Sequence, residues 1–229
     1  MYDDTTKRLL SLLRNGEITY DLLWALFQPN DITYTRCFGT QKPRCFKFNF
    51  GAEKTTRGGT KYWNIEGRYL DFDGEEFGEV EIELHIAKFQ GAKKINLLDA
   101  FPLQYHPDSD EIRTELLECG RKFVSLKGTH HRHCRGIAFV MEDGAPVKVF
   151  IDSRIMIDAK FFKKMNPNYS RPTVIECFDV WGFADDPAFV KIVPPATSDS
   201  IKRTYLSHDD LLICCPTVPG FSLEDKLWG

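Results

Sequence analysis

The most regular pattern in the chain is an alternation of hydrophobic and polar residues between positions 79 and 86. The hydrophobic positions are Val80, Ile82, Leu84 and Ile86, and the positions between them are Glu79, Glu81, Glu83 and His85. A period of two sends successive side chains to opposite faces of a strand. This pattern therefore predicts a strand with one buried face and one acidic face.

Two further stretches carry strand signals. Phe46, Phe48 and Phe50 alternate with polar residues, and Gly58-Gly59 after them is a turn signal. Hydrophobic runs over 136–141 and 146–152 flank Glu142-Asp143-Gly144, which predicts a β-hairpin. Shorter strands are predicted over 173–180 and 189–193, and the glycine-rich stretch 67–78 is predicted to turn tightly.

Helical spacing appears in other segments. Leucines cluster over 5–14 ahead of Gly16, and Thr19 is placed to cap a second helix over 20–27, so the start of the chain predicts a helical hairpin. Hydrophobic residues recur at helical spacing over 109–125, where Asp108 and Glu111 have capping-box spacing and Gly120 is a weak point. Short helices are predicted over 158–164 and after Ser207, with a loop over 194–206.

These elements predict an α+β fold built on an antiparallel β-sheet or a partly open barrel, with an N-terminal helical hairpin and a few additional short helices. The chain has 229 residues, of which 42% are hydrophobic, which is enough for a substantial core. We divide it into a helical hairpin over 1–30, a β-rich domain over 31–193 and a linker-like segment over 194–229.

Charge is nearly balanced overall and uneven locally. The net charge is −3, which gives no global attraction to nucleic acid or to anionic membranes. The segment 121–135 is basic and the segment 66–85 is acidic, so we expect these patches to meet each other or a partner. The candidate interface residues are Arg121, Lys122, Lys127, Arg132, Arg135, Glu79, Glu81 and Glu83. Nucleic-acid binding is disfavoured because no stacking aromatic residues interleave with the basic run.

One cluster has the residue types of a metal site or a thiol enzyme. His130, His131, His133 and Cys134 lie within five residues, and both residue types ligate metals. The spacing is poor, because adjacent ligands point to opposite sides of a strand, and it favours a polar turn before the strand at 136–141. We therefore predict no catalytic residues, no bound metal and no cofactor, and keep a metal- or thiol-dependent enzyme as an alternative. The vicinal pair Cys214-Cys215 is interpreted as two buried thiols.

The chain has the sequence character of a soluble intracellular protein, cytoplasmic or nuclear, without a membrane partner. The hydrophobic run Leu22 to Phe27 is much shorter than the roughly 20 residues that span a bilayer. The start of the chain lacks the basic and apolar regions of a secretory signal. Seven dispersed cysteines without a C-x-x-C motif are typical of free thiols in a reducing compartment.

Seven segments together resemble a known family. They are LLWALFQPN (22–30), GRYLDFDGEEFGE (67–79), AFPLQYHPD (100–108), CGRKFVSLKG (119–128), SRIMIDAKFF (153–162), NPNYSRP (166–172) and DDLLICCPTVPGFSLEDKLWG (209–229). They are similar to the N-terminal region of large fungal AAA-type ATPases, a region treated as a domain of unknown function. In that family a linker and an ATPase module with Walker motifs follow the last segment, whereas this chain contains no G-x-x-x-x-G-K-[ST] loop.

The resemblance implies a non-catalytic recognition or adaptor domain that binds a protein client or regulates a AAA-type ATPase, in cis or in trans. ATP and Mg²⁺ would then belong only to the associated ATPase module. The alternatives are a stand-alone module that binds nucleic acid or an acidic protein through 121–135, and the enzyme built on the histidine and cysteine cluster.

Overall fold

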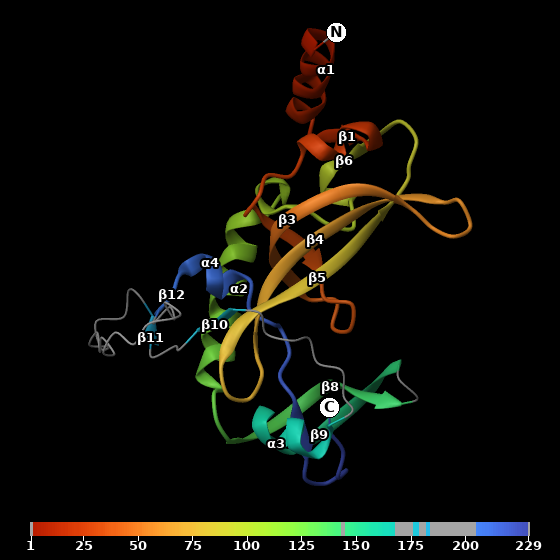
Figure 1. The fold of residues 1–229 in the computed structure, drawn as a ribbon. Coiled ribbons are helices and arrows are strands. Elements are labelled where there is room, and N and C mark those ends of the chain that lie inside the picture. The colour runs from red at the N-terminus through yellow and green to blue at the C-terminus, as the bar shows by residue number, and fades with distance from the viewer. Residues whose placement is uncertain (1, 143–144, 168–175, 179–181, 184–204, 229) are drawn as a thin grey trace, which may run out of the picture.

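An open antiparallel sheet of six strands lies at the centre of the protein (Figure 1). The computed structural model describes residues 2–142, 145–167, 176–178, 182–183 and 205–228. The strand order is β10-β5-β4-β3-β2-β7. The strands are β2 (Ile32–Arg36), β3 (Pro43–Thr55), β4 (Lys61–Phe72), β5 (Phe77–Ala87), β7 (Phe101–Pro102) and β10 (Glu176–Phe178). The described residues form an α+β fold with open sheets, which confirms the predicted class.

The strand with the alternating pattern is β5, and its two faces differ as predicted. Val80 and Ile86 are buried, whereas Glu81 and Glu83 are exposed. Glu79 differs from this pattern, because it is buried and its carboxylate forms an ion pair with Arg68 at 2.8 Å. The tight turn is shorter than the predicted range 67–78. Gly67 lies within β4, packed against the ring of Phe46, and only residues 73–76 separate β4 from β5.

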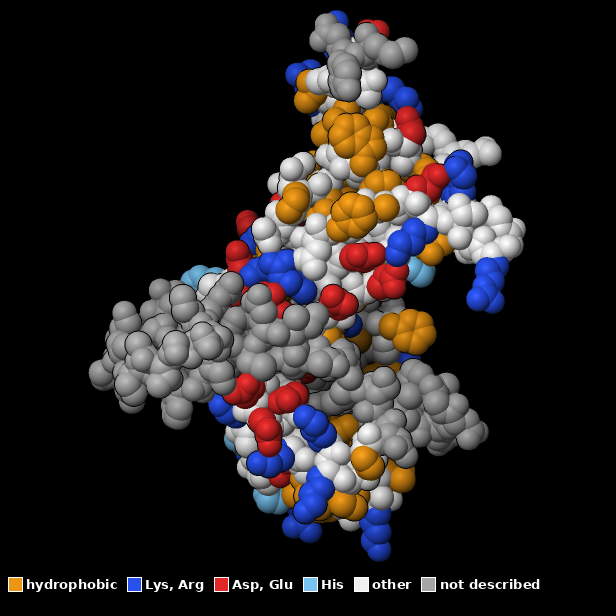
Figure 2. Space-filling view, in the orientation of Figure 1, with side chains coloured by type: hydrophobic (Ala, Val, Ile, Leu, Met, Phe, Trp, Pro, Cys, Tyr) orange, Lys and Arg blue, Asp and Glu red, His pale blue; other side chains and the backbone are white. Residues whose placement is uncertain are grey.

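The N-terminal elements cover one end of this sheet. They are α1 (Tyr2–Arg14), β1 (Glu17–Thr19) and the 3-10 helix η1 (Tyr20–Ala25), and β1 pairs with β6 (Ala92–Lys94). The two helices of the predicted hairpin are present, with the short strand β1 between them. In Figure 1 α1 projects away from the sheet, and in Figure 2 hydrophobic side chains gather at its base, over β1 and β6. The short 3-10 helices η2 (Ile95–Leu97) and η3 (Leu103–Tyr105) follow.

Helix α2 (Ser109–Ser125) runs along the side of the sheet and covers part of its core with Leu116 and Phe123. Its bounds match the prediction. Asp108 is the N-cap residue but makes no capping hydrogen bond with its side chain, so the predicted capping box is wrong. Gly120 does not end the helix. It lies directly against the backbone of Leu211, because a glycine lets the two chains approach closely.

A second, smaller sheet lies below the first (Figure 1). It has the order β13-β9-β8 and is made of β8 (His130–Glu142), β9 (Ala145–Ile157) and β13 (Gly220–Ser222). The predicted hairpin is present with longer strands. Helix α3 (Ala159–Met165) follows β9 and is capped by Asp158, whose carboxylate accepts a hydrogen bond from the Phe161 N–H at 2.7 Å.

The two sheets are connected by contacts at the turn between β4 and β5. Gly74 has a φ of +103°, and a Cβ there would lie 2.7 Å from the backbone of Lys160 in α3. Asp73 and Glu75 in the same turn form ion pairs with Lys163 and Lys160 of α3 at 3.3 and 3.4 Å. Asp73 and Glu75 of this turn therefore pair with lysines of α3.

The C-terminal segment 205–228 joins the two sheets. It contains β12 (Tyr205–Leu206), which pairs in parallel with β11 (Gly182–Phe183), then α4 (His208–Leu212) and β13. Leu211, Leu212 and Ile213 are buried in the main core. The Leu70 N–H donates to the Ile213 carbonyl at 2.9 Å, and further along β13 pairs with β9. The predicted cap at Ser207 is confirmed as a capping box with Asp210.

The predicted domain boundaries at 30/31 and 193/194 stay a prediction, as do most of the expected strands 173–180 and 189–193 and most of the loop 194–206. Of these residues only 176–178, 182–183 and 205–206 are described. Among the helices of the described part of the chain, none has the length and hydrophobicity needed to cross a membrane.

Candidate functional site

The histidine and cysteine cluster lies within strand β8 and not in a turn before it. Successive residues of a strand alternate between its faces, so His133 and Cys134 point to opposite sides. The ring of His133 pairs with Asp152 at 2.8 Å, and the His130 ring contacts the Lys127 carbonyl at 3.0 Å. Among the described residues no three His, Cys, Asp or Glu side chains gather as metal ligands.

The vicinal thiols lie where the C-terminal segment meets β4. Cys214 is buried, and the Cys215 N–H donates to the Leu70 carbonyl at 2.8 Å. Burial raises the pKa of Cys214 well above its ordinary value and the pKa of Cys215 to about 11. Both thiols are therefore protonated at neutral pH, which is the unreactive form of cysteine.

This protonation predicts slow alkylation of the folded protein. A rise of the Cys215 pKa from 9.0 to about 11 lowers its thiolate fraction near neutral pH by roughly a hundredfold. Mass spectrometry after iodoacetamide treatment should show Cys215 labelled at least about a hundredfold more slowly in the folded than in the denatured protein. Equal labelling rates in the two states would contradict the raised pKa of Cys215 in the folded protein.

The predicted basic interface residues do not form one patch. Arg121 and Lys122 are exposed on α2, and Lys127 lies near the ring of Phe77 at 5.9 Å. Arg132 and Arg135 are three positions apart on β8 and therefore point to opposite faces. Of the acidic candidates, Glu79 is paired with Arg68, Glu83 is paired with Lys54 at 3.1 Å, and Glu81 is exposed on β5.

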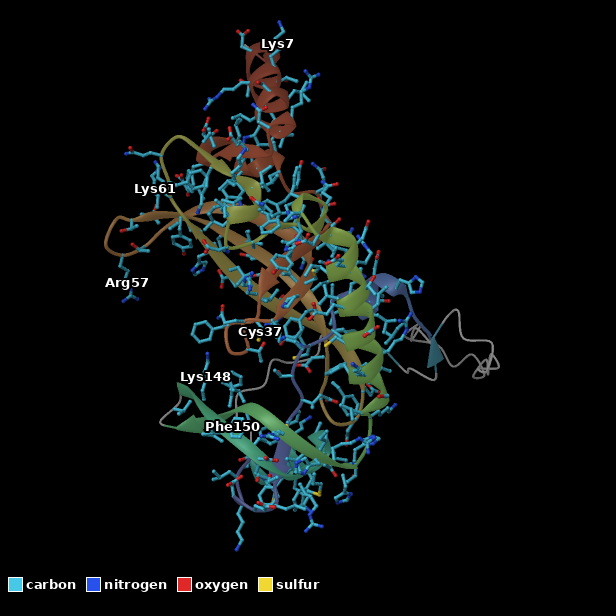
Figure 3. The ribbon with its side chains drawn as sticks, turned by 180° about the vertical axis from the view of Figure 1, so that it is seen from behind. Lys7, Cys37, Arg57, Lys61, Lys148 and Phe150 are labelled. Carbon is cyan, nitrogen blue, oxygen red and sulfur yellow. The ribbon has the colours of Figure 1, made fainter. Side chains whose placement is uncertain are left out.

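A different surface forms where the turn between β2 and β3 meets the hairpin β8–β9. A Cβ on Gly39 would lie 2.9 Å from Cζ of Phe139, so this turn sits directly on the hairpin. Figure 3 shows Cys37 of the turn above Lys148 and Phe150 of β9. In the hairpin register Ile137 pairs with Phe150 and Phe139 pairs with Lys148, which places these four side chains on one face.

Three hydrophobic side chains of this surface are open to solvent. Phe38 is 83% exposed, Phe150 is 68% exposed and Ile137 is 64% exposed. We call Phe38, Ile137, Phe139 and Phe150 the junction patch. Isolated exposed hydrophobic residues are common, but a group of large ones from two separate parts of a fold is typical of a binding surface.

The rim of the junction patch carries a surplus of positive charge. Arg135, Lys148 and Arg154 share the hairpin face with a single acid, Asp152. Asp152 is already paired with His133 at 2.8 Å and with Arg135 at 3.4 Å. Lys148 and Arg154 have no acidic partner within ion-pair distance among the described residues.

The turn that carries Phe38 is held by its own hydrogen bonds. The Cys37 N–H donates to the Lys42 carbonyl at 2.9 Å, and the Gln41 N–H donates to the Cys37 carbonyl at 2.8 Å. Burial opposes ionisation of the Cys37 thiol, but hydrogen bonds from Thr40 and Gly39 outweigh it and lower the pKa of Cys37. The turn therefore presents Phe38 from a fixed backbone.

One residue in the sequence indicates this surface, although it lies outside the predicted strands. Phe38 stands in a polar turn next to Gly39, where a large aromatic side chain has no core to enter. Ile137 and Phe150 belong to runs that read as buried strands, and only the hairpin register shows that they share an open face.

The described residues thus form an open antiparallel α+β fold with an exposed hydrophobic patch at the contact between the β2–β3 turn and the hairpin. Residues 8–107, which are fewer than half of the 229, match the family described as Domain of unknown function (DUF7025). This match covers the chain from within α1 to just after η3. The chain matches no curated protein and no solved structure.

Proposed function

We propose that the protein is a non-catalytic recognition domain that binds a protein partner through the junction patch and works with a AAA-type ATPase. The exposed group of Phe38, Ile137 and Phe150 is the observation that carries the proposal. Large aromatic side chains dominate the binding energy of protein interfaces when a partner buries them.

The rim indicates what kind of partner fits. Lys148 and Arg154 would favour carboxylates placed around a hydrophobic contact, because opposite charges steer association and fix orientation. The expected partner surface is therefore hydrophobic at its centre and acidic at its edge. Arg135 was among the predicted interface residues, and it belongs to this rim.

The link to a AAA-type ATPase rests on the seven sequence segments that resemble the front region of such motors. Two of these segments form elements that connect the two sheets. Segment 153–162 includes the end of β9 and the start of α3, and segment 209–229 includes most of α4 and all of β13. In this proposal the chain supplies recognition and the associated module supplies ATP hydrolysis.

Truncating the aromatic residues of the junction patch should weaken binding without unfolding the protein. Phe38→Ser and Phe150→Ser each remove an exposed ring, and we expect each to weaken binding to a purified AAA-type ATPase module by about thirtyfold. Thermal melts should stay unchanged, because these side chains contribute little to the core. Titration calorimetry of the wild type and the two variants measures binding, and scanning calorimetry measures their melting temperatures.

The matched control is Phe50→Ser. Phe50 is 57% exposed on β3, but it lies seven residues after Pro43, about 23 Å along the strand. Its truncation should leave binding unchanged. ATP hydrolysis by the purified chain above a buffer blank would contradict the non-catalytic role.

A further inference from the structure

A cavity of about 430 Å³ lies between the N-terminal elements and the main sheet. These N-terminal elements lie at the opposite end of the molecule from the hairpin β8–β9 (Figure 1). The cavity is lined by residues of α1, β1, η1, β3 and β4 and by the segment that follows β5. All of its lining residues fall within 8–107, the part of the chain that matches the domain of unknown function. Its volume is in the range of ligand sites.

Three aromatic side chains contribute walls to the cavity. Tyr20 and Phe89 contact each other edge to face, with ring centroids 5.8 Å apart. Trp63 lies directly across from Glu53 in the register of β3 and β4, and its indole packs over Gly51, where a Cβ would lie 2.8 Å from Nε1. Because Gly51 has no side chain, the indole of Trp63 can pack against its backbone.

Two of these residues carry buried polar atoms without a well-formed hydrogen bond. The hydroxyl of Tyr20 and the indole Nε1 of Trp63 are buried and have no hydrogen-bond partner of good geometry among the described residues. Burial, followed by the charge of the Glu53 carboxylate and a weak hydrogen bond to it, raises the pKa of the Tyr20 hydroxyl, so this hydroxyl keeps its proton. Unpartnered buried donors are uncommon and costly, and they favour a ligand that accepts hydrogen bonds.

The charges around the cavity favour an anion. The two carboxylates are already neutralised, Glu53 by Lys61 at 2.5 Å and Asp21 by Arg8 at 3.2 Å. The ammonium groups of Lys88 and Lys93 lie over the rings of Tyr20 and Phe89, each 5.7 Å from the centroid. Neither has a carboxylate within ion-pair distance in the described part of the chain.

We propose that this cavity binds a carboxylate carried on an aromatic or aliphatic body. The carboxylate would accept from the Lys88 ammonium and the Tyr20 hydroxyl, and the body would lie against Phe89 and Trp63. Charge-assisted hydrogen bonds hold the acid group, and the aromatic walls bury the rest. The carboxylate can belong to a free small acid or to the last residue of a peptide, since both present the same chemistry.

Nuclear magnetic resonance of the indole N–H of Trp63 tests the proposal directly. The probes are phenylacetate and the peptide N-acetyl-Gly-Gly-Phe with a free C-terminus, each compared with its neutral amide at millimolar concentration. The Trp63→Phe variant assigns the signal. We expect a saturable shift of that signal with at least one acid and none with either amide. The acid that produces the shift shows whether the site takes a free small acid or the C-terminus of a peptide.

Variants separate this site from other effects. Lys88→Met should weaken binding of the effective acid by at least about tenfold, and Tyr20→Phe, which removes only the hydroxyl, should weaken it severalfold. Lys122→Met, on the exposed face of α2, is the matched control and should leave binding unchanged. Both cavity variants change only the polar end of a side chain, so we expect both to fold. The chemical-shift dispersion of each spectrum checks that the variant is folded.

Equal shifts with acids and amides would overturn the proposal, as would a Trp63 signal that no acid moves. Loss of binding to an ATPase module in the Phe38→Ser variant is a separate result. The cavity and the junction patch are thus tested independently, and either proposal can fail without the other.

Discussion

Replacing Lys47 by Met should lower the free energy of unfolding by about 3 kcal/mol. The Nζ of Lys47 on β3 lies 2.7 Å from the carboxylate of Asp210 on α4, and the side chains are only 11% and 3% exposed. Methionine preserves the length of the stem but leaves the Asp210 carboxylate buried without its cation. An unpaired buried charge costs far more than the loss of an exposed pair. Urea denaturation monitored by circular dichroism measures the change.

The matched control is Lys61→Met. The ion pair of Lys61 and Glu53 is slightly shorter, at 2.5 Å, but its side chains are 49% and 37% exposed. Exposed pairs contribute about 0–1 kcal/mol, so this variant should remain within about 1 kcal/mol of the wild type. Equal losses in the two variants would contradict the buried role of the Lys47–Asp210 pair.

The same pair predicts a dependence on pH. Burial alone would raise the pKa of Asp210, but hydrogen bonds from Lys47 and Ser207 outweigh burial and lower it below 3.8. A carboxyl group whose pKa is lower in the folded state stabilises the fold above its unfolded pKa, near 3.9. That contribution is lost as the pH falls further, through the folded pKa. The stability difference between wild type and Lys47→Met should therefore be constant from about pH 5 to 7 and shrink below about pH 4.

Replacing Gly120 by Ala should destabilise the protein by about 2 kcal/mol or more, although alanine is the better helix former. In a solvent-exposed helix the same change would stabilise by up to about 1 kcal/mol. Here the new Cβ would overlap the carbonyl oxygen of Leu211 and lie 2.9 Å from its carbonyl carbon. Backbone cannot move aside as a flexible side chain can, so α2 and α4 would have to separate.

Gly136→Ala provides the comparison for Gly120. Gly136 lies in β8, and no atom lies within 4 Å of the Cβ that an alanine would add there. This variant should change the free energy of unfolding by less than about 1 kcal/mol. A Gly120→Ala variant that is as stable as the wild type would contradict the close packing of α2 on α4.

Local patterns predicted those elements whose signal lies within one segment. The alternation in β5 and the helical spacing of α2 each bury one face against the core, so their sequence periods match the structure. The predicted helix caps were only partly confirmed. Ser207 and Asp210 form the expected capping box, whereas Asp108 does not cap α2 with its side chain.

Features that depend on contacts between distant segments could not be predicted. Gly120 reads as a weak point in a helix until Leu211 is known to pack on it. Phe38 and Phe150 are 112 positions apart in the sequence, and only the contact of Gly39 with Phe139 brings their segments together. The cavity likewise combines Arg8, Tyr20, Glu53 and Lys88, whose chemistry is unremarkable in isolation.

Direct titration of the chain against a purified AAA-type ATPase module is the most decisive measurement for its proposed role. We expect saturable binding that Phe38→Ser and Phe150→Ser each weaken by about thirtyfold and that Phe50→Ser leaves unchanged. A module that does not bind would contradict the link to the ATPase. Binding that is equally strong in all three variants would contradict recognition through the junction patch.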